Sequence, residues 1–327
     1  MKKLRVAALV ALAVLTGAAH AARTLNAVVF PSGFNWPLWV ATEKGEFARE
    51  GLEVKLTLTP GSVLQMEGLA AGKFDVGMTT IDNVVAYDEG QGEARLEAPA
   101  DFFAFMGGQI GAVRLDAQPD IHSIAELKGR SLAVDAVSTG YAFVLRKLLQ
   151  HGGLREGDYT LEEVGSTGKR AVVLMEGKTA ATILTSPLEI LPESRGFNRL
   201  VNASDVVGPY QALVGVARRS WARENADALV GFIRAYVRAL AWLGDPGNRM
   251  EAVAIYRKNV PGASEEIAQR AWNVMLGGSE GFQKRAKLDP EAIGTVLALR
   301  REFGKPGVPL GQPDKYLDET YYARAVR

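Results

Sequence analysis

The sequence contains no cysteine and only three histidines among its 327 residues. Without cysteine there is no disulfide framework, no thiolate zinc site and no acceptor for a lipid anchor at a processed N-terminus. His20 falls in the N-terminal segment, and His122 and His151 are predicted at surface helix boundaries. No residues have the spacing of metal ligands, so we expect neither a metal nor another cofactor.

Long apolar runs are also absent, except near the N-terminus. Three basic residues at positions 2, 3 and 5 precede an apolar stretch over 6–15, and Ala19-His20-Ala21 has the small-x-small form of a cleavage site. Ten apolar residues are too few to cross a bilayer, which needs about 20. The pattern predicts a secretory signal over 1–21, with a frayed N-terminal helix as the alternative. The mature chain is then expected in the periplasm, without a lipid anchor.

The charges show no excess of either sign. The chain has 38 basic and 37 acidic residues, a net charge of +1, and no basic block. We therefore expect no nucleic-acid partner and no anionic membrane partner. Residues 22–327 form a segment longer than a single compact hydrophobic core usually supports, and this length favours two lobes.

Strand-like and helix-like segments alternate in two series. The first has strands near 24–30, 52–59 and 74–79 with helices between them, followed by apolar strands near 102–108 and 111–115. The second begins with a capping box at Ser123 and Glu126, a strand near 131–135, a helix closed by Gly152 and Gly153, and a strand near 180–184. Each series is the βαβ pattern of an open, mainly parallel sheet.

The remainder of the chain is mostly helical. A strand near 211–219 is followed by predicted helices over 221–243, 248–258, 264–275 and 290–302. Asp289-Pro290 is an N-cap followed by proline at the first helical position. We expect this segment to return to the first unit, which gives lobe 1 over 22–108, lobe 2 over 109–212 and the second part of lobe 1 over 213–327. Two crossings, near 105–112 and 208–216, would form a hinge around a cleft.

Motifs of catalysis are absent. The sequence has no Gly-x-Ser-x-Gly, no phosphate-binding Walker loop and no Gly-x-Gly-x-x-Gly. No sequence pattern identifies two carboxylates as a catalytic acid–base pair. We therefore predict no catalytic residues and a binding protein in preference to an enzyme.

Four strand-to-helix junctions are the candidate ligand contacts, because the first N–H groups of a helix can bind ligand oxygen atoms. At the first junction, Phe34, Asn35 and Trp36 precede Pro37. The two aromatic rings would stack on a flat or apolar ligand, or else pack between the lobes.

The second junction, "TTIDNVV", offers Thr79, Thr80, Asp82 and Asn83. Thr79 and Asp82 have the spacing of a capping box, which would account for both without any ligand. If Asp82 faces the cleft instead, its carboxylate favours an ammonium or N–H group of the ligand.

The third and fourth junctions belong to the second series. In "VDAVSTGYAF", Asp135, Ser138, Thr139 and Tyr141 are candidates, with a plain N-cap as the alternative for Ser138. In "LTSPLE", the candidates are Thr185 and Ser186. Ser186 and Glu189 also have capping-box spacing, so whether Asp82 and Glu189 contact ligand or only cap helices stays open.

Several segments together resemble the periplasmic solute-binding proteins of nitrate, taurine, alkanesulfonate and thiamine-pyrimidine ABC importers. They are "FNWPLWVATEKGEFAREGLEVKL", "LAAGKFDVGMTTIDNVV", "SIAELKGRSLAVDAVSTGYAFVLRKLLQHGGL" and "AVVLMEGKTAATILTSPLEIL". The resemblance implies a type II periplasmic-binding-protein fold, α/β, with two doubly wound lobes, a two-strand hinge and a helical C-terminal segment on lobe 1. It implies capture of a small molecule in the cleft, contacts at the four junctions, and delivery by a monomer to a membrane permease with its ATPase.

Two alternatives stay open. Eukaryotic thiamine-pyrimidine synthases share this fold but use an active-site histidine and a cysteine-rich iron-binding motif, and this chain has no cysteine. An exported enzyme and a ligand sensor for a membrane signalling partner therefore remain as alternative functions. No arginine lies in the four junctions, so we expect a neutral, aromatic or nitrogen-bearing ligand such as a pyrimidine over a sulfonate or nitrate. Lys169 or Arg170 at the cleft rim would reverse that expectation.

Overall fold

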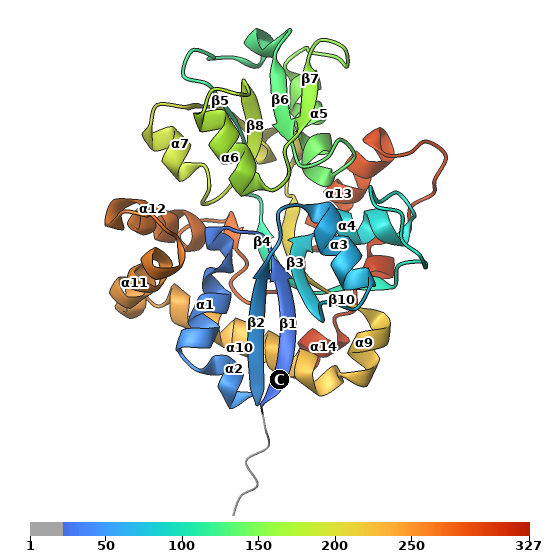
Figure 1. Cartoon of the computed structure of the whole chain (residues 1–327), viewed down its shortest axis with the longest axis vertical. Helices are drawn as coiled ribbons and strands as arrows, with labels where there is room; N and C mark the ends of the chain where they lie inside the picture. Colours follow the sequence, from blue (N-terminus) through green and yellow to red (C-terminus); the bar gives the residue numbers. More distant parts are fainter. Residues whose placement is uncertain (1–21) are drawn as a thin grey trace, which may run out of the picture.

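The computed structural model describes residues 22–327, and the predicted signal over 1–21 lies outside the described residues. Two β-sheets each carry helices on their faces, one above the other in Figure 1. We call the larger sheet with its helices lobe 1 and the smaller sheet with its helices lobe 2.

The sheet of lobe 1 has six strands in the order β11-β4-β10-β3-β1-β2. Their bounds are β1 Arg23–Val29, β2 Leu52–Leu58, β3 Val76–Thr80, β4 Phe102–Ile110, β10 Gln211–Arg218 and β11 Gly281–Phe282. β1 is parallel to β2 and β3, whereas β10 runs antiparallel to β3 and β4. The strands of the predicted βαβαβ series, β1, β2 and β3, are thus parallel as predicted, and β10, which brings the chain back from lobe 2 in the opposite direction, makes the sheet mixed.

The sheet of lobe 2 has five strands in the order β7-β6-β8-β5-β9. Their bounds are β5 Val113–Ala117, β6 Ser131–Val134, β7 Thr160–Glu163, β8 Ala181–Thr185 and β9 Asn198–Asn202. β6 is parallel to β7 and β8, and β5 is antiparallel to β8 and β9. Here too the strand that enters from the other lobe, β5, makes the sheet mixed.

Fourteen α-helices occur in the described residues. They are α1 Trp36–Glu43, α2 Glu46–Arg49, α3 Ser62–Ala70, α4 Ile81–Asp88, α5 Gly140–His151, α6 Thr167–Met175, α7 Ile190–Ser194, α8 Ser204–Val207, α9 Arg219–Glu224, α10 Ala226–Gly244, α11 Arg249–Asn259, α12 Glu265–Leu276, α13 Pro290–Phe303 and α14 Thr320–Ala325. None of the helices within 22–327 combines the length and the apolarity that a membrane crossing requires.

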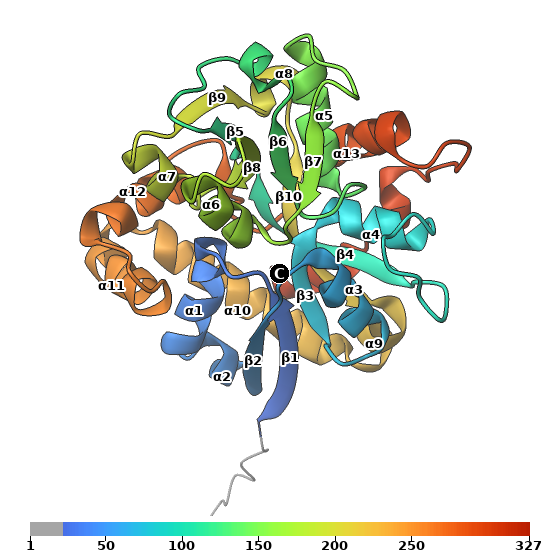
Figure 2. The same cartoon turned by 45° about the horizontal axis from the view of Figure 1, so that its top comes forward.

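The C-terminal helices pack mainly on lobe 1. The predicted helix over 221–243 is two helices, α9 and α10, which meet at Asn225, and the side-chain amide of Asn225 donates to the carbonyl of Trp221. α10 packs along α1, α2 and α14. The predicted cap of α13 is present, since the carboxylate of Asp289 accepts from the N–H groups of residues 291 and 292. α11 and α12 lie on one flank of the molecule and α13 on the other (Figure 2).

The chain crosses between the lobes twice, and the two crossings lie side by side. β4 runs into β5 through Gly111 and Ala112, and the return path enters β10 after Tyr210. The N–H of Gly111 donates to the carbonyl of Tyr210 at 2.8 Å. Gly111 and Ala112 have φ angles of 55° and 54°, and this left-handed conformation is costly for alanine. The paired segments form the hinge of the two-lobe fold.

Candidate ligand-binding site

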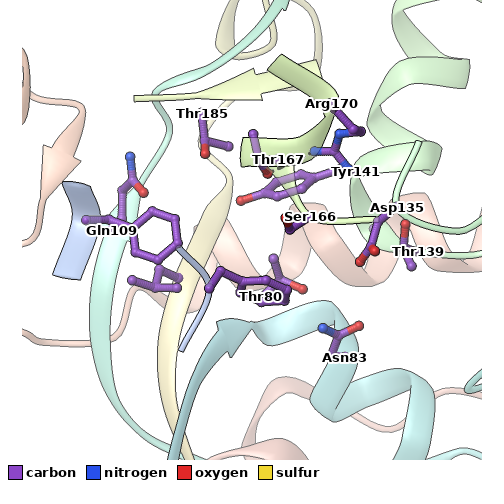
Figure 3. Close-up of a pocket in the computed structure, with 14 residues that line it drawn as sticks. Thr80, Asn83, Gln109, Asp135, Thr139, Tyr141, Ser166, Thr167, Arg170 and Thr185 are labelled. Atoms are coloured by element: carbon purple, nitrogen blue, oxygen red, sulfur yellow. Dashed lines mark hydrogen bonds between the residues drawn. The ribbon is translucent and has the colours of Figure 1, made fainter. Parts of the chain in front are cut away.

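A cavity of about 40 Å³ lies between the two lobes, next to the hinge. A single water needs about 10–15 Å³ on the same measure, so the cavity suits a small ligand. Lobe 1 contributes Phe30, Phe34, Thr80, Asn83, Gln109 and Leu213, and lobe 2 contributes Asp135, Thr139, Gly140, Tyr141, Ser166, Thr167, Arg170 and Thr185. Figure 3 shows Thr80 and Asn83 across the cavity from Tyr141, Arg170 and Thr185.

Three helices begin at the cavity wall. Thr80, Thr139 and Ser166 are the N-cap residues of α4, α5 and α6. The hydroxyls of Thr80 and Thr139 cap no backbone N–H, and that of Thr139 donates to the carbonyl of Ala136 instead. The first N–H groups of these helices and the positive ends of their dipoles can therefore interact with electron-rich ligand atoms.

Two opposite charges line the lobe 2 side of the cavity, Arg170 and Asp135. The guanidinium of Arg170 is buried and donates to the carbonyl of Ile183 at 3.2 Å and to the hydroxyl of Thr167 at 2.9 Å. Its Nε has no hydrogen-bond acceptor among the described residues. Burial lowers the pKa of Arg170 and Asp135 opposes this, but an arginine stays protonated at neutral pH. The cavity wall thus contains a cation and a carboxylate.

Aromatic rings supply the apolar part of the wall. Phe30 and Phe34 come from the segment between β1 and α1, and Tyr141 comes from the first turn of α5. Burial raises the pKa of the Tyr141 phenol, so this group is a neutral hydrogen-bonding partner at physiological pH. Rings of this kind favour stacking on flat or apolar ligand groups.

The lobes contact each other directly beside the cavity. The N–H of Ser166 in lobe 2 donates to the carbonyl of Pro60 in lobe 1 at 3.1 Å. The N–H of Ser62 in lobe 1 donates to a carboxylate oxygen of Asp135 at 3.3 Å. The structure therefore has the lobes closed over the cavity.

Seven of the thirteen residues predicted at the site line the cavity, and all four predicted junctions contribute at least one. They are Phe34, Thr80, Asn83, Asp135, Thr139, Tyr141 and Thr185. That these residues contact a ligand stays a prediction.

Asn35 and Trp36 lie outside the cavity, which corrects their predicted position. The indole N–H of Trp36 donates to the carbonyl of Ala252, and its ring lies 4.6 Å from that of Tyr256. The side-chain amide of Asn35 donates to the carbonyl of Phe30. A 3₁₀ turn over Gly33–Asn35 separates the directions of these side chains, so Phe34 points into the cavity while Trp36 enters the core of lobe 1.

Thr79 and Asp82 are also outside the cavity, and they do not form the predicted capping box. The hydroxyl of Thr79 accepts from the side-chain amide of Asn83 at 2.8 Å. Asp82 is completely buried and accepts two hydrogen bonds from Arg300 of α13. The long-range ion pair with a residue 218 positions away replaces the local cap.

Ser138 and Ser186 lie beside the cavity without lining it. The N–H and hydroxyl of Ser138 both donate to Glu93 of lobe 1, and Thr139 is the N-cap of α5 in its place. Ser186 donates to the carboxylate of Glu189 at 2.7 Å, and Glu189 also pairs with Arg114 at 3.4 Å. Glu189 therefore belongs to a buried polar cluster and not to a capping box.

Sequence reasoning missed half of the lining residues. One signal was available, because "GSTG" at 165–168 repeats the Ser-Thr-Gly of the third junction at 138–140. Ser166 and Thr167 follow from that repeat, and Arg170 follows one turn later on the same helix face. Gly140 belongs to the predicted third junction, whereas Phe30, Gln109 and Leu213 carry no comparable signal. Within 22–327, no three histidine or acidic side chains are grouped so as to hold a metal ion.

Comparison with known proteins identifies relatives in sequence. The family described as "NMT1/THI5 like" matches residues 35–247, which is more than half of the chain. A Bacillus subtilis (strain 168) protein named "Putative aliphatic sulfonates-binding protein" is 29% identical over 217 residues. The match covers 63% of this chain and 61% of that relative's length.

Solved structures share the fold over nearly the whole chain. A protein of Bordetella bronchiseptica RB50 has a TM-score of 0.77 at 21% identity, covering 94% of this chain and 97% of its own. The periplasmic nitrate-binding protein NrtA from Synechocystis PCC 6803 has a TM-score of 0.76 at 14% identity, covering 93% of this chain and 88% of its own. At such identities the likeness confirms the periplasmic-binding-protein fold.

Proposed function

We propose that this chain, which belongs to the NMT1/THI5-like family, is the periplasmic solute-binding component of an ABC importer. It captures a small organic molecule between its lobes and delivers it to a membrane permease with its ATPase. The observation that carries the proposal is the cavity itself, in which helix N-termini of both lobes, three aromatic rings and a buried arginine converge. Contacts to both lobes exist only in the closed form, so the ligand shifts the protein toward that form.

The position of Arg170 changes the expected ligand. The preference for a neutral ligand depended on the absence of arginine from the junctions, and Arg170 lines the cavity with an Nε that no described residue accepts from. A sulfonate, carboxylate or similar anionic group in the cavity would be attracted to the positive charge of this guanidinium. Asp135 in the same wall favours an N–H or ammonium group elsewhere on the ligand. We therefore propose a small organic acid that also carries nitrogen.

Thermal-shift measurements on residues 22–327 test this ligand class. The panel contains matched pairs, such as 2-aminoethanesulfonate with ethanesulfonate, together with nitrate, pyrimidines, aromatic acids and amines. A ligand present at 100 times its Kd stabilises the protein by about 2.7 kcal/mol. The proposal expects the compound with both groups to give the largest shift, and it fails if only neutral compounds or only amines bind.

Substitution of Arg170 adds a matched control. Arg170→Lys keeps the charge but loses the planar donor arrangement, so we expect the affinity for an acidic ligand to fall about tenfold or more. Lys169→Met removes a charge of the same sign from the neighbouring, exposed position and should leave affinity within about twofold. Titration calorimetry compares the two variants. An unchanged affinity in Arg170→Lys would mean that Arg170 acts only through its charge and not through its planar donor groups.

We propose binding without turnover. The ionisable side chains in the cavity wall are Asp135, Tyr141 and Arg170, and burial keeps the phenol of Tyr141 protonated. Mass spectrometry of the bound compound after prolonged incubation separates this proposal from an exported enzyme, because an enzyme would convert it. Co-purification with a signalling protein instead of a permease would favour a sensor.

A further inference from the structure

A buried ion pair outside the cavity wall joins α4 to α13. Arg300 Nε lies 2.7 Å from Asp82 Oδ1, and Arg300 Nη2 lies 2.6 Å from Asp82 Oδ2. Both side chains are excluded from solvent. The guanidinium also donates to the side chain of Gln91 at 3.2 Å. All of these partners belong to lobe 1, so Arg300 is firmly held by one lobe.

The same guanidinium also contacts lobe 2. Arg300 Nη2 donates to the carbonyl of Ser138 at 2.9 Å, directly before the first turn of α5. Its Cζ lies 4.8 Å from the ring centroid of Phe143, one turn into α5. Farther along the two helices, Phe143 stacks on Phe303 and Lys147 pairs with Glu302 at 2.9 Å. α13 therefore lies along α5 of the other lobe, with Arg300 at the N-terminal end of α5.

The first turn of α5 and the first turn of α4 touch at this point. A Cβ atom added to Gly140 would lie 2.6 Å from the Cβ of Asp82 and 2.7 Å from the hydroxyl oxygen of Tyr210. Gly140 lines the cavity, and Thr80 and Asn83, on either side of Asp82, line its opposite wall. The contact that Arg300 secures thus sets the separation of the two cavity walls.

We propose that Arg300 is a positioning residue that holds the cavity walls together. It does not line the cavity, and it acts through Asp82, which adjoins the wall residue Asn83, and through the carbonyl of Ser138, which adjoins the wall residue Thr139. Because these bonds can all be made only when α5 lies against α4, Arg300 stabilises the closed arrangement of the lobes. Its value for ligand capture rests on the proposed function, whereas its effect on the lobes requires no ligand.

Hydrogen exchange in the absence of ligand tests the inference. The amide of Ser166, the N-cap residue of α6, is bonded across the lobes to Pro60, whereas the amide of Val164 is bonded within lobe 2 to Val134 at 2.9 Å. Exchange of Ser166 should follow separation of the lobes, and exchange of Val164 should follow opening within lobe 2. Residue-resolved exchange by NMR reports both amides in one sample.

The test variant is Asp82→Asn/Arg300→Met, which removes both charges and leaves no buried charge without a partner. We expect Ser166 to exchange about tenfold faster, equivalent to about 1.4 kcal/mol, with Val164 unchanged. Arg300→Lys, which keeps the charge but cannot make every bond, should accelerate Ser166 less and serves if the double variant does not fold. Lys147→Met removes the exposed pair on the same helices and should change neither rate by more than about twofold.

Two results would overturn the inference. Unchanged exchange at Ser166 in a folded double variant would make the ion pair a structural feature of lobe 1 alone. Equal acceleration of Ser166 and Val164 would indicate loosening of lobe 2 in place of lobe separation. Neither result bears on whether the cavity binds a transported ligand, which the thermal-shift panel decides independently.

Discussion

Two aspartates, Asp82 between the lobes and Asp116 inside lobe 2, are completely buried, and their surroundings differ. Asp82 accepts two hydrogen bonds from the guanidinium of Arg300. Asp116 lies in β5, and neither of its carboxyl oxygens has a donor among the residues that the structure describes. The same side chain is thus buried once with an opposite charge and once without any hydrogen-bond partner.

The difference decides which charge state each site carries. The pKa of Asp116 is raised to about 8, mainly by burial. The nearby carboxylates of Glu193 and Glu189 together raise this pKa by more than Arg199 and Arg114 lower it. Asp116 therefore holds a proton at neutral pH. At the other site Asp82 raises the pKa of Arg300 despite burial, so that arginine stays charged. One site is stabilised by an ion pair and the other by a proton, and the two respond differently to substitution and to pH.

Breaking the ion pair should have the largest effect. Asp82→Asn leaves Arg300 as a buried charge without its partner, and we expect a loss of about 3–5 kcal/mol in the free energy of unfolding. Asp82→Asn/Arg300→Met should recover most of this loss, because no buried charge remains. Urea denaturation at pH 7 measures both. A loss as large in the double variant as in the single one would mean that packing, and not charge, dominates the site.

Substitution of Asp116 should matter mainly through pH. The unfolded carboxyl loses its proton near its ordinary pKa of 3.8, whereas the folded one keeps it to about pH 8. Between these pH values the folded state thus binds more protons than the unfolded state. The stability that the protonated Asp116 contributes is therefore fully present below about pH 4 and is lost as the pH rises through 8. Relative to Asp116→Asn, the wild type should lose about 2.7 kcal/mol between about pH 5 and pH 7. If the difference in unfolding free energy between the wild type and Asp116→Asn did not change with pH, Asp116 would not be protonated in the folded protein at neutral pH.

Much of the fold follows from local sequence, and the clearest cases are helix ends and strands. Asp289-Pro290 begins α13 as predicted, and the apolar stretch "FFAFMGG" lies within β4, which is buried along almost its whole length. These elements depend on neighbours a few residues away, which a sequence displays directly. The local pattern predicts the parallel strands β1, β2 and β3, whereas the antiparallel orientation of β10 depends on the chain returning from lobe 2.

The site was predictable to the extent that it uses strand-to-helix junctions. Thr80, Thr139 and Thr185 reach the cavity because each stands where a strand ends or a helix begins. Trp36 and Asp82 stand in the same junctions but find partners 216 and 218 positions away, at Ala252 and Arg300. Sequence spacing carries no information about such long-range partners, so the direction of those two side chains could not be derived.

The smallest effect should come from Glu193→Gln, which alters the surroundings of Asp116 without touching Asp82. The carboxylate of Glu193 is the strongest like-charged influence on Asp116, so its removal should lower the pKa of Asp116. Glu193 also pairs with Arg199 and, at 3.8 Å, with Arg270, but these arginines are partly exposed, and we expect less than about 1 kcal/mol of lost stability at pH 7. The free energy of unfolding of Glu193→Gln and of Glu193→Gln/Asp116→Asn is measured across a range of pH. The quantity of interest is the pH at which the difference between these two free energies stops growing. That pH should lie below the corresponding value for the wild type and Asp116→Asn. An unchanged value would mean that Glu193 does not control the protonation of Asp116, and the contrast with Asp82 would then rest on the Arg300 guanidinium that Asp116 lacks.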